Sequence, residues 1–451
     1  MQQLISTRLE QLVSYLEPLL PLANCHMVDF FTKIAYETFI PLRIRTEITD
    51  MGYQESLDAI LTSNVSEIKC PMLYKFLSDC RKHSLPNCKD VCIDLRDFKQ
   101  NLIAMGCHDV TGLHLQDFMS SKKSHEVEIM SEIAAAMCNI ARTDHLVDIG
   151  DGKGYLSSAL ALYNGLKVLG VDSSDINTKG ATKRADKLNK QWTGLTGIEK
   201  NSRRNDFYKR TTKFISPDVD LTKLVQDHFN GDHCSKLGLV GLHTCGNLAP
   251  SCLTIFNTNT DVKTICNVGC CYHLLDEDLS KSDYGFPMSN LLKEKQFTLG
   301  RNARMLSCQS IERILHGSEL PSSILFYRAL LQVLLTEHCP TLMEKPVGRF
   351  GQKSTTFLDY VQKAFEKFGV ETAVPESEIN KVYDNYLPLE KTLQIFYLLR
   401  AHVAPIIEAV ILLDRLLFLH EQGWTRSFLV GLFDPVISPR CYGIIAFKDE
   451  V

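Results

Sequence analysis

The chain has 451 residues, of which 45% are hydrophobic and 23% charged, and a formal net charge of −4 at pH 7. This composition is typical of a globular protein with a full hydrophobic core and excludes a chain dominated by disorder. A net charge this small does not indicate a class of binding partner. The sixteen cysteines include no CxxC pair, which indicates reduced thiols rather than a disulfide framework.

The first residues, MQQLISTRLEQLVSYL, lack the basic patch and apolar core of a secretion signal. They predict an amphipathic helix instead. The most apolar stretch, 401–420, contains Glu408, Asp414 and Arg415, whose charges oppose insertion into a bilayer. We therefore expect a soluble protein of the cytoplasm or the nucleus, with no membrane partner and with an oligomeric state that the sequence leaves open.

Residues 1–115 are predicted to form a helical N-terminal region, because apolar residues recur every three or four positions. A longer helix is expected over 119–142, with Ser124 as its cap and Glu126 and Glu128 in its first turn. Its predicted apolar face consists of Val127, Met130, Ile133, Ala134 and Met137.

From Leu146 onward, short apolar runs alternate with helical segments, which is the pattern of a doubly wound parallel sheet. The five predicted strands are 146–150, 166–172, 212–216, 237–244 and 262–269. Two further strands, 427–435 and 441–448, are joined by VISPR and predict an antiparallel hairpin. The sequence therefore predicts an α/β fold with a Rossmann-like sheet over 116–275, a helical insertion over 276–425 and a hairpin over 426–451 that completes the sheet.

A glycine-rich turn, Gly150, Gly152 and Gly154, follows the first predicted strand in the string D-x-G-x-G-x-G. Glycines let the main chain turn tightly and approach a ligand, but this spacing differs from the GxGxxG of dinucleotide sites. Asp148, two residues before the first glycine, would repel a pyrophosphate and attract the ammonium group of S-adenosyl-L-methionine. The turn therefore favours S-adenosyl-L-methionine as the cofactor.

Asp172 ends the second predicted strand, where a carboxylate can accept hydrogen bonds from both ribose hydroxyls. Asp148 and Asp172 are thus expected to hold the cofactor together with the three glycines. The alternative is that both carboxylates only stabilise turns and loops of a Rossmann-like domain that binds no cofactor. Asp151, between the first two glycines, is expected to lie near the cofactor's own carboxylate and to weaken binding.

HTC stands at the end of the fourth predicted strand and CCYH directly follows the fifth, so these polar side chains are expected at one edge of the sheet. Methyl transfer requires an oriented acceptor and removal of its proton, which makes His243, Tyr272 and His273 the candidate catalytic residues. Each histidine is equally compatible with a hydrogen bond inside a loop.

The same region offers soft ligands for zinc. They are Cys266, Cys270, Cys271 and His273, with His243 and Cys245 nearby. Because C-x3-C-C-x-H is not a standard finger spacing and adjacent cysteines seldom share one ion, we favour buried thiols and predict no metal.

The segment 177–213 contains eleven Lys or Arg residues against three acidic residues, with three aromatic residues among them. Such a mixture is typical of surfaces that bind nucleic acid, so RNA is the expected partner; the alternative is a solvated insertion. The candidate substrate contacts are Lys122, Lys123, Lys183, Arg184, Arg203 and Arg204.

From about Met119 to the C-terminus, the chain resembles the methyltransferase-like protein 25 family. Besides the glycine turn, the motifs that carry this resemblance are GLHTCGNLA, NVGCCYHLL, RNARMLSCQS, LLDRLLFLHEQGW and LFDPVISPR. The resemblance implies a class I S-adenosylmethionine-dependent methyltransferase fold. HTCG and CCYH are also similar to the HLCG and CCHH motifs of a tRNA 2′-O-methyltransferase family, with Tyr272 replacing the first histidine. We expect a methyltransferase that acts on RNA; the alternatives are a small-molecule or protein methyltransferase and a non-catalytic scaffold.

Overall fold

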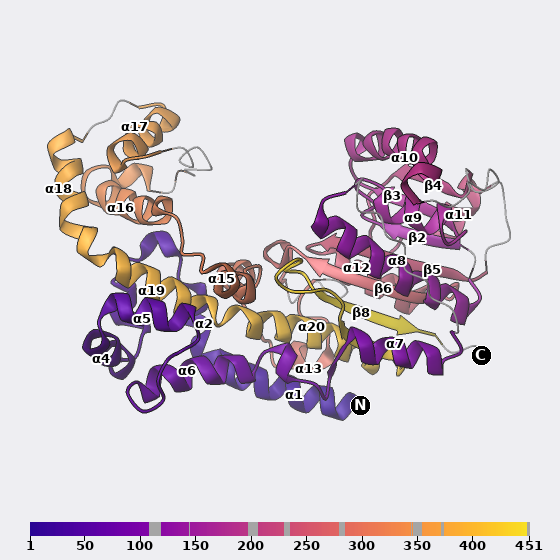
Figure 1. Ribbon diagram of the computed structural model, residues 1–451, viewed down its shortest axis with the longest axis horizontal. Helices are drawn as coiled ribbons and strands as arrows, with labels where there is room; N and C mark the ends of the chain where they lie inside the picture. Colours follow the sequence, from indigo (N-terminus) through magenta and orange to yellow (C-terminus); the bar gives the residue numbers. More distant parts are fainter. Residues whose placement is uncertain are drawn as a thin grey trace. The chain divides into compact units, whose positions relative to one another are not determined.

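The computed structural model describes residues 1–107, 119–143, 145–196, 206–229, 235–278, 285–343, 345, 354–370 and 374–448, without the side chains of 189 and 192–196. The chain divides into two compact units, drawn in Figure 1 with colours that follow the sequence. One unit consists of Met1–Tyr15, His83–Cys308 and Ile406–Val451; the other consists of Leu16–Lys82 and Gln309–Pro405. Both units therefore combine segments that are far apart in the chain. The boundaries predicted from the sequence, at 115, 275 and 425, mark places where the hydrophobic pattern changes along the chain.

The first unit is built on an eight-stranded sheet with the order β1-β7-β8-β6-β5-β2-β3-β4. The strands are β1 (Cys92–Asp94), β2 (His145–Ile149), β3 (Lys167–Asp172), β4 (Tyr208–Thr212), β5 (Leu237–Cys245), β6 (Val262–Cys270), β7 (Ser427–Gly431) and β8 (Tyr442–Phe447). Strands β2 to β6 pair in parallel, and β8 lies antiparallel between β6 and β7. The α/β class, the parallel core and the C-terminal antiparallel hairpin are therefore confirmed.

Two strands differ from the prediction. Strand β4 begins at Tyr208 and ends at Thr212, so 213–216 form a loop instead of the predicted strand. The aromatic ring of Tyr208 is buried in the core, and this tertiary contact sets the register of the strand. Strand β1, in the region expected to be helical, has only three residues and pairs with β7; so short a strand has too few residues to show an alternating pattern.

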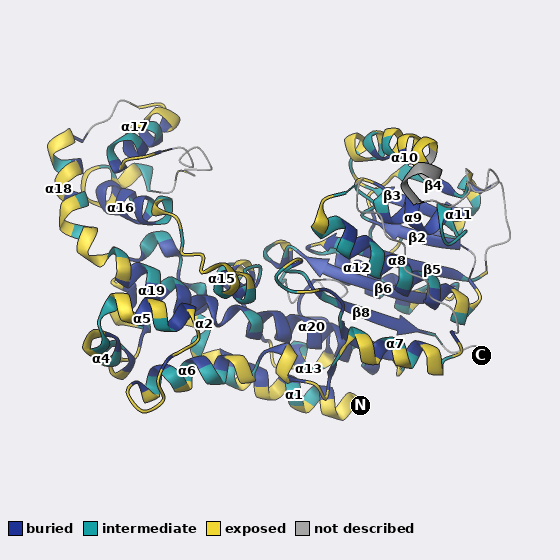
Figure 2. Ribbon diagram, in the orientation of Figure 1, coloured by how far each residue is buried: buried dark blue, intermediate teal, exposed yellow. Residues whose placement is uncertain are grey.

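Helices accompany the sheet in the first unit, and Figure 2 draws their buried residues in dark blue. Besides α1 (Gln2–Leu16), these are α7 (Leu95–Ala104), α8 (Ser121–Ala141), α9 (Tyr155–Leu162), α10 (Asp175–Thr196), α11 (Leu221–His228), α12 (Leu248–Thr258), α13 (Asn290–Glu294), α14 (Arg301–Leu306) and α20 (Ala404–Glu421). Helix α8 packs against β5 and β6, and α12 packs on the same two strands. The predicted apolar face of α8 is buried.

The start of α8 corrects a prediction. Ser120 is its N-cap residue, so Ser124 lies inside the helix and is buried. Glu126 therefore does not lie in the first turn, where an exposed acid would favour the helix dipole. Its side chain is directed into the protein and is fully buried, which gives it the role described below.

The second unit is helical in its described residues. Its helices are α2 (Leu20–Asn24), α3 (Ala35–Phe39), α4 (Leu42–Met51), α5 (Tyr53–Leu61), α6 (Pro71–Lys82), α15 (Ile311–Gly317), α16 (Ser323–His338), α17 (Phe357–Phe368), α18 (Glu376–Tyr386) and α19 (Glu390–Ala401). The buried guanidinium of Arg400 donates to the carbonyl oxygens of Leu22 and Ala23 at 3.2 and 2.8 Å, which joins α19 to α2.

One helical stretch, within Glu376–Glu421, is long and apolar enough to cross a membrane by length and composition. Of its most apolar window, 89% is buried inside the protein. Three charged residues of its α20 part, Glu408, Asp414 and Arg415, are buried as well. The Asp414 carboxyl accepts hydrogen bonds from the main-chain N–H groups of Met288 and Ser289 at 2.7 and 2.9 Å. Packing in the protein thus accounts for its apolar character.

Candidate active site

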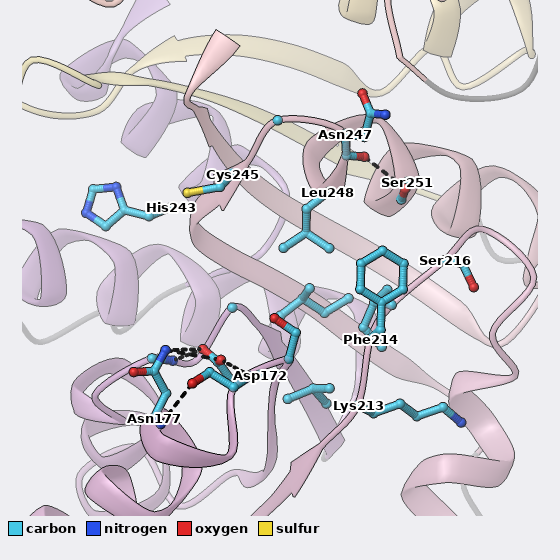
Figure 3. Close-up of a pocket in the computed structure, with 18 of the residues that line it drawn as sticks. Asp172, Asn177, Lys213, Phe214, Ser216, His243, Cys245, Asn247, Leu248 and Ser251 are labelled. Carbon is cyan, nitrogen blue, oxygen red and sulfur yellow. Dashed lines mark hydrogen bonds between the residues drawn. The ribbon is translucent and has the colours of Figure 1, made fainter. Parts of the chain in front are cut away.

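A cavity of about 760 Å³ lies beyond the carboxyl ends of β2, β3, β4 and β5. Figure 3 shows the side chains around it. The lining residues come from the glycine turn, the end of β3, the loop after β4 and the end of β5. They are Ile149, Gly150, Gly152, Val171–Ser174, Asn177, Lys213–Asp218, His243, Cys245–Leu248, Ser251 and Leu274. This is the edge at which a parallel sheet places its ligands.

The glycine turn presents bare main chain to the cavity. Gly150 and Gly152 have φ values of +81° and +57°, a region that other residues adopt only at a cost. The N–H of Gly150 donates to the Val171 carbonyl oxygen at 2.8 Å, and the N–H of Gly152 donates to the Asp172 carboxylate at 3.0 Å. The turn is therefore fixed to the end of β3 and held open toward the cavity.

Asp172 is oriented by several donors. Besides Gly152, its carboxylate accepts from the Ser174 N–H at 2.8 Å and from the Asn177 side-chain amide at 3.2 Å. Figure 3 shows these bonds around Asp172 at the rim of the cavity. The same Asn177 nitrogen also lies 3.3 Å from the other carboxylate oxygen, so each of the about four lone-pair sites of Asp172 already faces a donor. The contact with the exposed Asn177 amide, which is shared between both oxygens, is the one that a ligand hydroxyl would replace.

The opposite side of the cavity is apolar. Phe214 is 76% exposed and lies in the loop after β4, near Leu248 of α12 in Figure 3. Leu274 is 56% exposed and also lines the cavity. Large exposed apolar side chains facing one cavity favour a flat hydrophobic group, such as a nucleobase, as part of the ligand. The sequence interpretation missed Phe214 because it placed this residue inside a strand; a strand ending at 212 would have placed it in a ligand-binding loop.

Asp148 does not line the cavity, which corrects its predicted contact with an ammonium group. It is buried at the end of β2, where its carboxyl accepts a hydrogen bond from the Ser157 hydroxyl at 2.8 Å. Burial and the neighbouring carboxyl of Asp151 raise the pKa of Asp148 well above its usual range. Asp148 thus binds Ser157 of α9 behind the glycine turn instead of contacting the cavity.

Asp151 also turns away from the cavity, contrary to the prediction. Its carboxyl is hydrogen-bonded to the hydroxyls of Ser157, at 2.6 Å, and Tyr208. The absence of a side chain at Gly170 makes room for it, since a Cβ there would lie 2.5 Å from an Asp151 carboxyl oxygen. Burial raises the pKa of Asp151. The expected repulsion of a ligand carboxylate therefore does not follow from this residue.

Gly154, predicted to contact the cofactor, serves packing instead. It is not among the lining residues, and a Cβ at this position would collide with the Tyr208 hydroxyl and lie 3.1 Å from the Ala181 Cβ. With φ at +72° it precedes α9. The glycine allows α9, α10 and β4 to approach closely.

His243 lines the cavity and is paired with a buried carboxylate. Its Nε2 lies 3.2 Å from a carboxylate oxygen of Glu126 on α8. The other oxygen of Glu126 accepts from the Ser438 hydroxyl at 2.6 Å and lies 3.6 Å from Lys122 Nζ. Burial raises the pKa of Glu126, but the hydrogen bonds with His243 and Ser438 outweigh it and lower the pKa to about 2. Glu126 is therefore anionic at neutral pH and fixes the imidazole.

Comparisons with known proteins give the family of the chain. Residues 122–278 match the model of a family described as a methyltransferase domain. The chain is 30% identical to probable methyltransferase-like protein 25 of Homo sapiens, with 99% of this chain and 97% of the human one covered. The chain belongs to the methyltransferase-like protein 25 family. The protein of the same name from Mus musculus is also 30% identical, with 98% and 96% covered.

Membership of this family makes the protein a methyltransferase, as the sequence predicted. A solved structure of coclaurine N-methyltransferase bound to N-methylheliamine and SAH also matches, at 11% identity and a TM-score of 0.23, with 98% of this chain and 100% of that chain covered. At that similarity the match carries no conclusion about this chain's site.

Tyr272, a predicted catalytic residue of this methyltransferase, is buried away from the cavity. Its hydroxyl donates to a carboxylate oxygen of Glu408 at 2.9 Å, and the guanidinium groups of Arg415 and Arg440 lie 5.7 and 5.6 Å from its ring centre. Arg440 forms an ion pair with Glu408 at 2.8 Å. Tyr272 therefore belongs to a buried network that holds α20 to the loop after β6, and it is not among the residues that line the cavity.

His273 is also not among the residues that line the cavity. Its Nδ1 lies 3.7 Å from the sulfur of Cys308, just beyond α14. Of the three residues predicted to act in catalysis, only His243 faces the cavity. No sequence pattern marked Glu126 as the partner of His243 or Ser438 as the partner of Glu126, because these residues are 117 and 312 positions apart and meet only through folding.

Three cysteines meet at the ends of β5 and β6. The sulfur atoms lie 3.1 Å apart in Cys245 and Cys270 and 3.4 Å apart in Cys245 and Cys271. Cys266 is not part of this group: it is buried deeper in β6, where its sulfur lies 3.7 Å from the sulfur of Met130. Hydrogen bonding from Cys270 lowers the pKa of the Cys245 thiol to about 6.

The predicted substrate contacts do not form one cluster in the part of the chain that the structure describes. Lys122 lies beside Glu126, and Lys123 and Arg184 both face the ring of Tyr155, each 5.9 Å from its centre. Lys183 is exposed on α10. Arg203 and Arg204 lie outside the described residues, as does the Trp192 side chain.

Proposed function

We propose that the cavity binds S-adenosyl-L-methionine and that the protein transfers its methyl group to an acceptor aligned beside His243. The observation that carries the proposal is Asp172, a carboxylate held by main-chain and side-chain donors at the mouth of a glycine turn. Asp172 would accept from the ribose hydroxyls, while Phe214 and Leu248 would contact the base. The main chain at Gly150 and Gly152 would leave room for the amino-acid part.

The cofactor, when bound, supplies a methyl group that is already activated for displacement. The protein's remaining tasks are to align the acceptor and to take up its proton. Because Glu126 is anionic and binds Nε2 of His243, the proton of the neutral imidazole stays on Nε2. Nδ1 is then the nitrogen that accepts a proton from a hydroxyl or ammonium group of the acceptor.

Binding of the cofactor is tested by calorimetry on the full chain. Asp172→Ala is expected to weaken binding of S-adenosyl-L-methionine at least tenfold, since it removes the ribose acceptor and loosens the Gly152 turn. Asp175→Ala is the matched control: Asp175 is an exposed acid three residues away that pairs with Lys179 at 2.6 Å. Absence of heat at millimolar cofactor with the unaltered protein contradicts the proposal and favours a non-catalytic scaffold.

RNA is the acceptor class that the surface favours. Lys183, Lys187 and Lys190 are exposed at helical spacing along one face of α10, which starts beside the cavity at Asp175, although Asp186 lies on the same face. Phosphate contacts by such a face give binding that falls steeply with salt. Equal affinity for RNA at low and high salt, or in a triple Lys→Gln variant of this face, would favour a protein or small-molecule acceptor.

A further inference from the structure

The three cysteines at the edge of the cavity form a group with the geometry of a metal site. Cys245 and Cys270 are the last residues of adjacent parallel strands and are direct register partners, so their side chains leave the same side of the sheet at the same level. All three sulfur atoms lie within 4.8 Å of one another. Sulfur atoms around a tetrahedral zinc ion, with Zn–S bonds of about 2.3 Å, are about 3.8 Å apart. The observed group therefore needs only a small expansion to surround an ion.

The main chain at Cys271 answers the objection that adjacent cysteines cannot share one ion. In a continuous strand the side chains of Cys270 and Cys271 would point to opposite faces. Cys271 instead has a φ of +52°, a left-handed conformation that non-glycine residues seldom adopt. This turn ends β6 and brings the sulfur of Cys271 back to within 3.4 Å of Cys245.

A buried cation lies behind the same strand end. Arg415 of α20 is 1% exposed, and its Nη2 has no hydrogen-bond partner within the part of the chain that the structure describes. A Cβ on Gly269 would collide with this guanidinium, so the charge lies against β6 one residue before Cys270. Buried charges require compensation. Three thiolates around one divalent ion carry a net negative charge, which would supply part of it.

We propose that Cys245, Cys270 and Cys271 bind one zinc ion through their three sulfur atoms. Cys245 is exposed and lines the cavity, so the fourth position of the ion faces the space that ligands enter. Three protein ligands and one open position are the arrangement of zinc sites that bind a substrate atom. The site goes beyond the proposed cofactor binding and does not depend on it.

The experiment measures metal content and ligand type in the full chain, purified under reducing conditions. We expect about one zinc ion per chain by mass spectrometry of the metals. After exchange for Co²⁺, we expect the absorption bands of a tetrahedral thiolate complex. Cys245→Ser should lower zinc content at least fivefold, and because this side chain is exposed the fold should survive. Cys339→Ser, a partly buried cysteine in the other unit, is the matched control.

Two results would overturn the proposal. One is zinc content that is negligible, or equal in the Cys245→Ser variant and the unaltered protein. The other is an intact mass of non-reduced protein that shows two hydrogens lost and a Cys245–Cys270 peptide pair, which would assign the group to a disulfide. Calorimetry with S-adenosyl-L-methionine on the metal-free protein is read separately, so failure of the metal site and failure of the cofactor proposal are distinguishable.

Discussion

The carboxylate of Glu126 lies 3.2 Å from Nε2 of His243, although the two residues are 117 positions apart in the sequence. Glu126 lies on helix α8, which precedes β2, and His243 lies near the end of β5. The contact places a fixed negative charge behind His243, which lines the cavity. It identifies Glu126 as a positioning residue for the proposed proton acceptor.

Replacement of this carboxylate tests the relationship. We expect Glu126→Gln to lower kcat for methyl transfer about 10- to 100-fold, because the amide no longer fixes the imidazole proton on Nε2. Binding of S-adenosyl-L-methionine should be unchanged when measured well below the melting temperature. The assay is transfer of a labelled methyl group to extract from cells that lack the protein. Glu128→Gln, two residues along α8, is the control, and a rise in KM with unchanged kcat would refute a positioning role.

The free energy of unfolding is expected to depend on pH because the carboxyls of Asp148 and Asp151 are buried. Burial raises the pKa of both groups in the folded protein, so the folded state holds a proton that the unfolded chain releases. This stabilisation is complete below the unfolded pKa of about 3.9 and is lost as pH rises through the folded pKa values. We therefore expect Asp148→Asn, which needs no proton, to raise Tm at pH 8 by about 2–4 °C.

The gain in Asp148→Asn should shrink as the pH is lowered toward 4, where the unaltered pair keeps its proton. Differential scanning calorimetry across this range measures it. Asp206→Asn, at a side chain that is 91% exposed, serves as the control. An Asp148→Asn protein less stable than the original at pH 8 would show that the ionised carboxylate itself stabilises the turn.

Replacement of Phe214 is expected to lower cofactor affinity without lowering the stability of the fold. Its ring is 76% exposed and lines the cavity, so its removal leaves the core unchanged. We expect Phe214→Ala to weaken binding of S-adenosyl-L-methionine about tenfold, the size of one aromatic contact. Ile176→Ala is the comparison, because Ile176 is 83% exposed and does not line the cavity. Equal calorimetric affinities of the two variants would place the base elsewhere.

Tyr272 provides a test of its structural role. We expect Tyr272→Phe to retain kcat within about twofold and to lose about 1 kcal/mol of unfolding free energy, because the Glu408 acceptor loses its hydroxyl donor. Urea denaturation and the methyl-transfer assay measure the two quantities. Loss of activity in a variant of unchanged stability would return Tyr272 to the catalytic residues.

The sequence by itself determined the class of the fold. Alternation of short apolar runs with helical segments predicted the parallel core, and VISPR between two such runs predicted the hairpin, because local periodicity reports which side chains must be buried. The same reasoning located the glycine turn, Asp172 and His243 at the carboxyl edge of the sheet.

Only the tertiary structure decided how the side chains point. Asp148 lies in β2 and Asp151 in the turn that follows, yet both carboxyls bind Ser157 of α9, and Asp151 also binds Tyr208. Tyr272 faces α20 instead of the cavity. Glu126 binds His243 with one carboxylate oxygen and Ser438 with the other, although these residues are 117 and 312 positions from it in the chain. Such contacts depend on the packing of segments far apart in the chain, whereas a sequence pattern reports only the spacing of neighbours along one strand or helix.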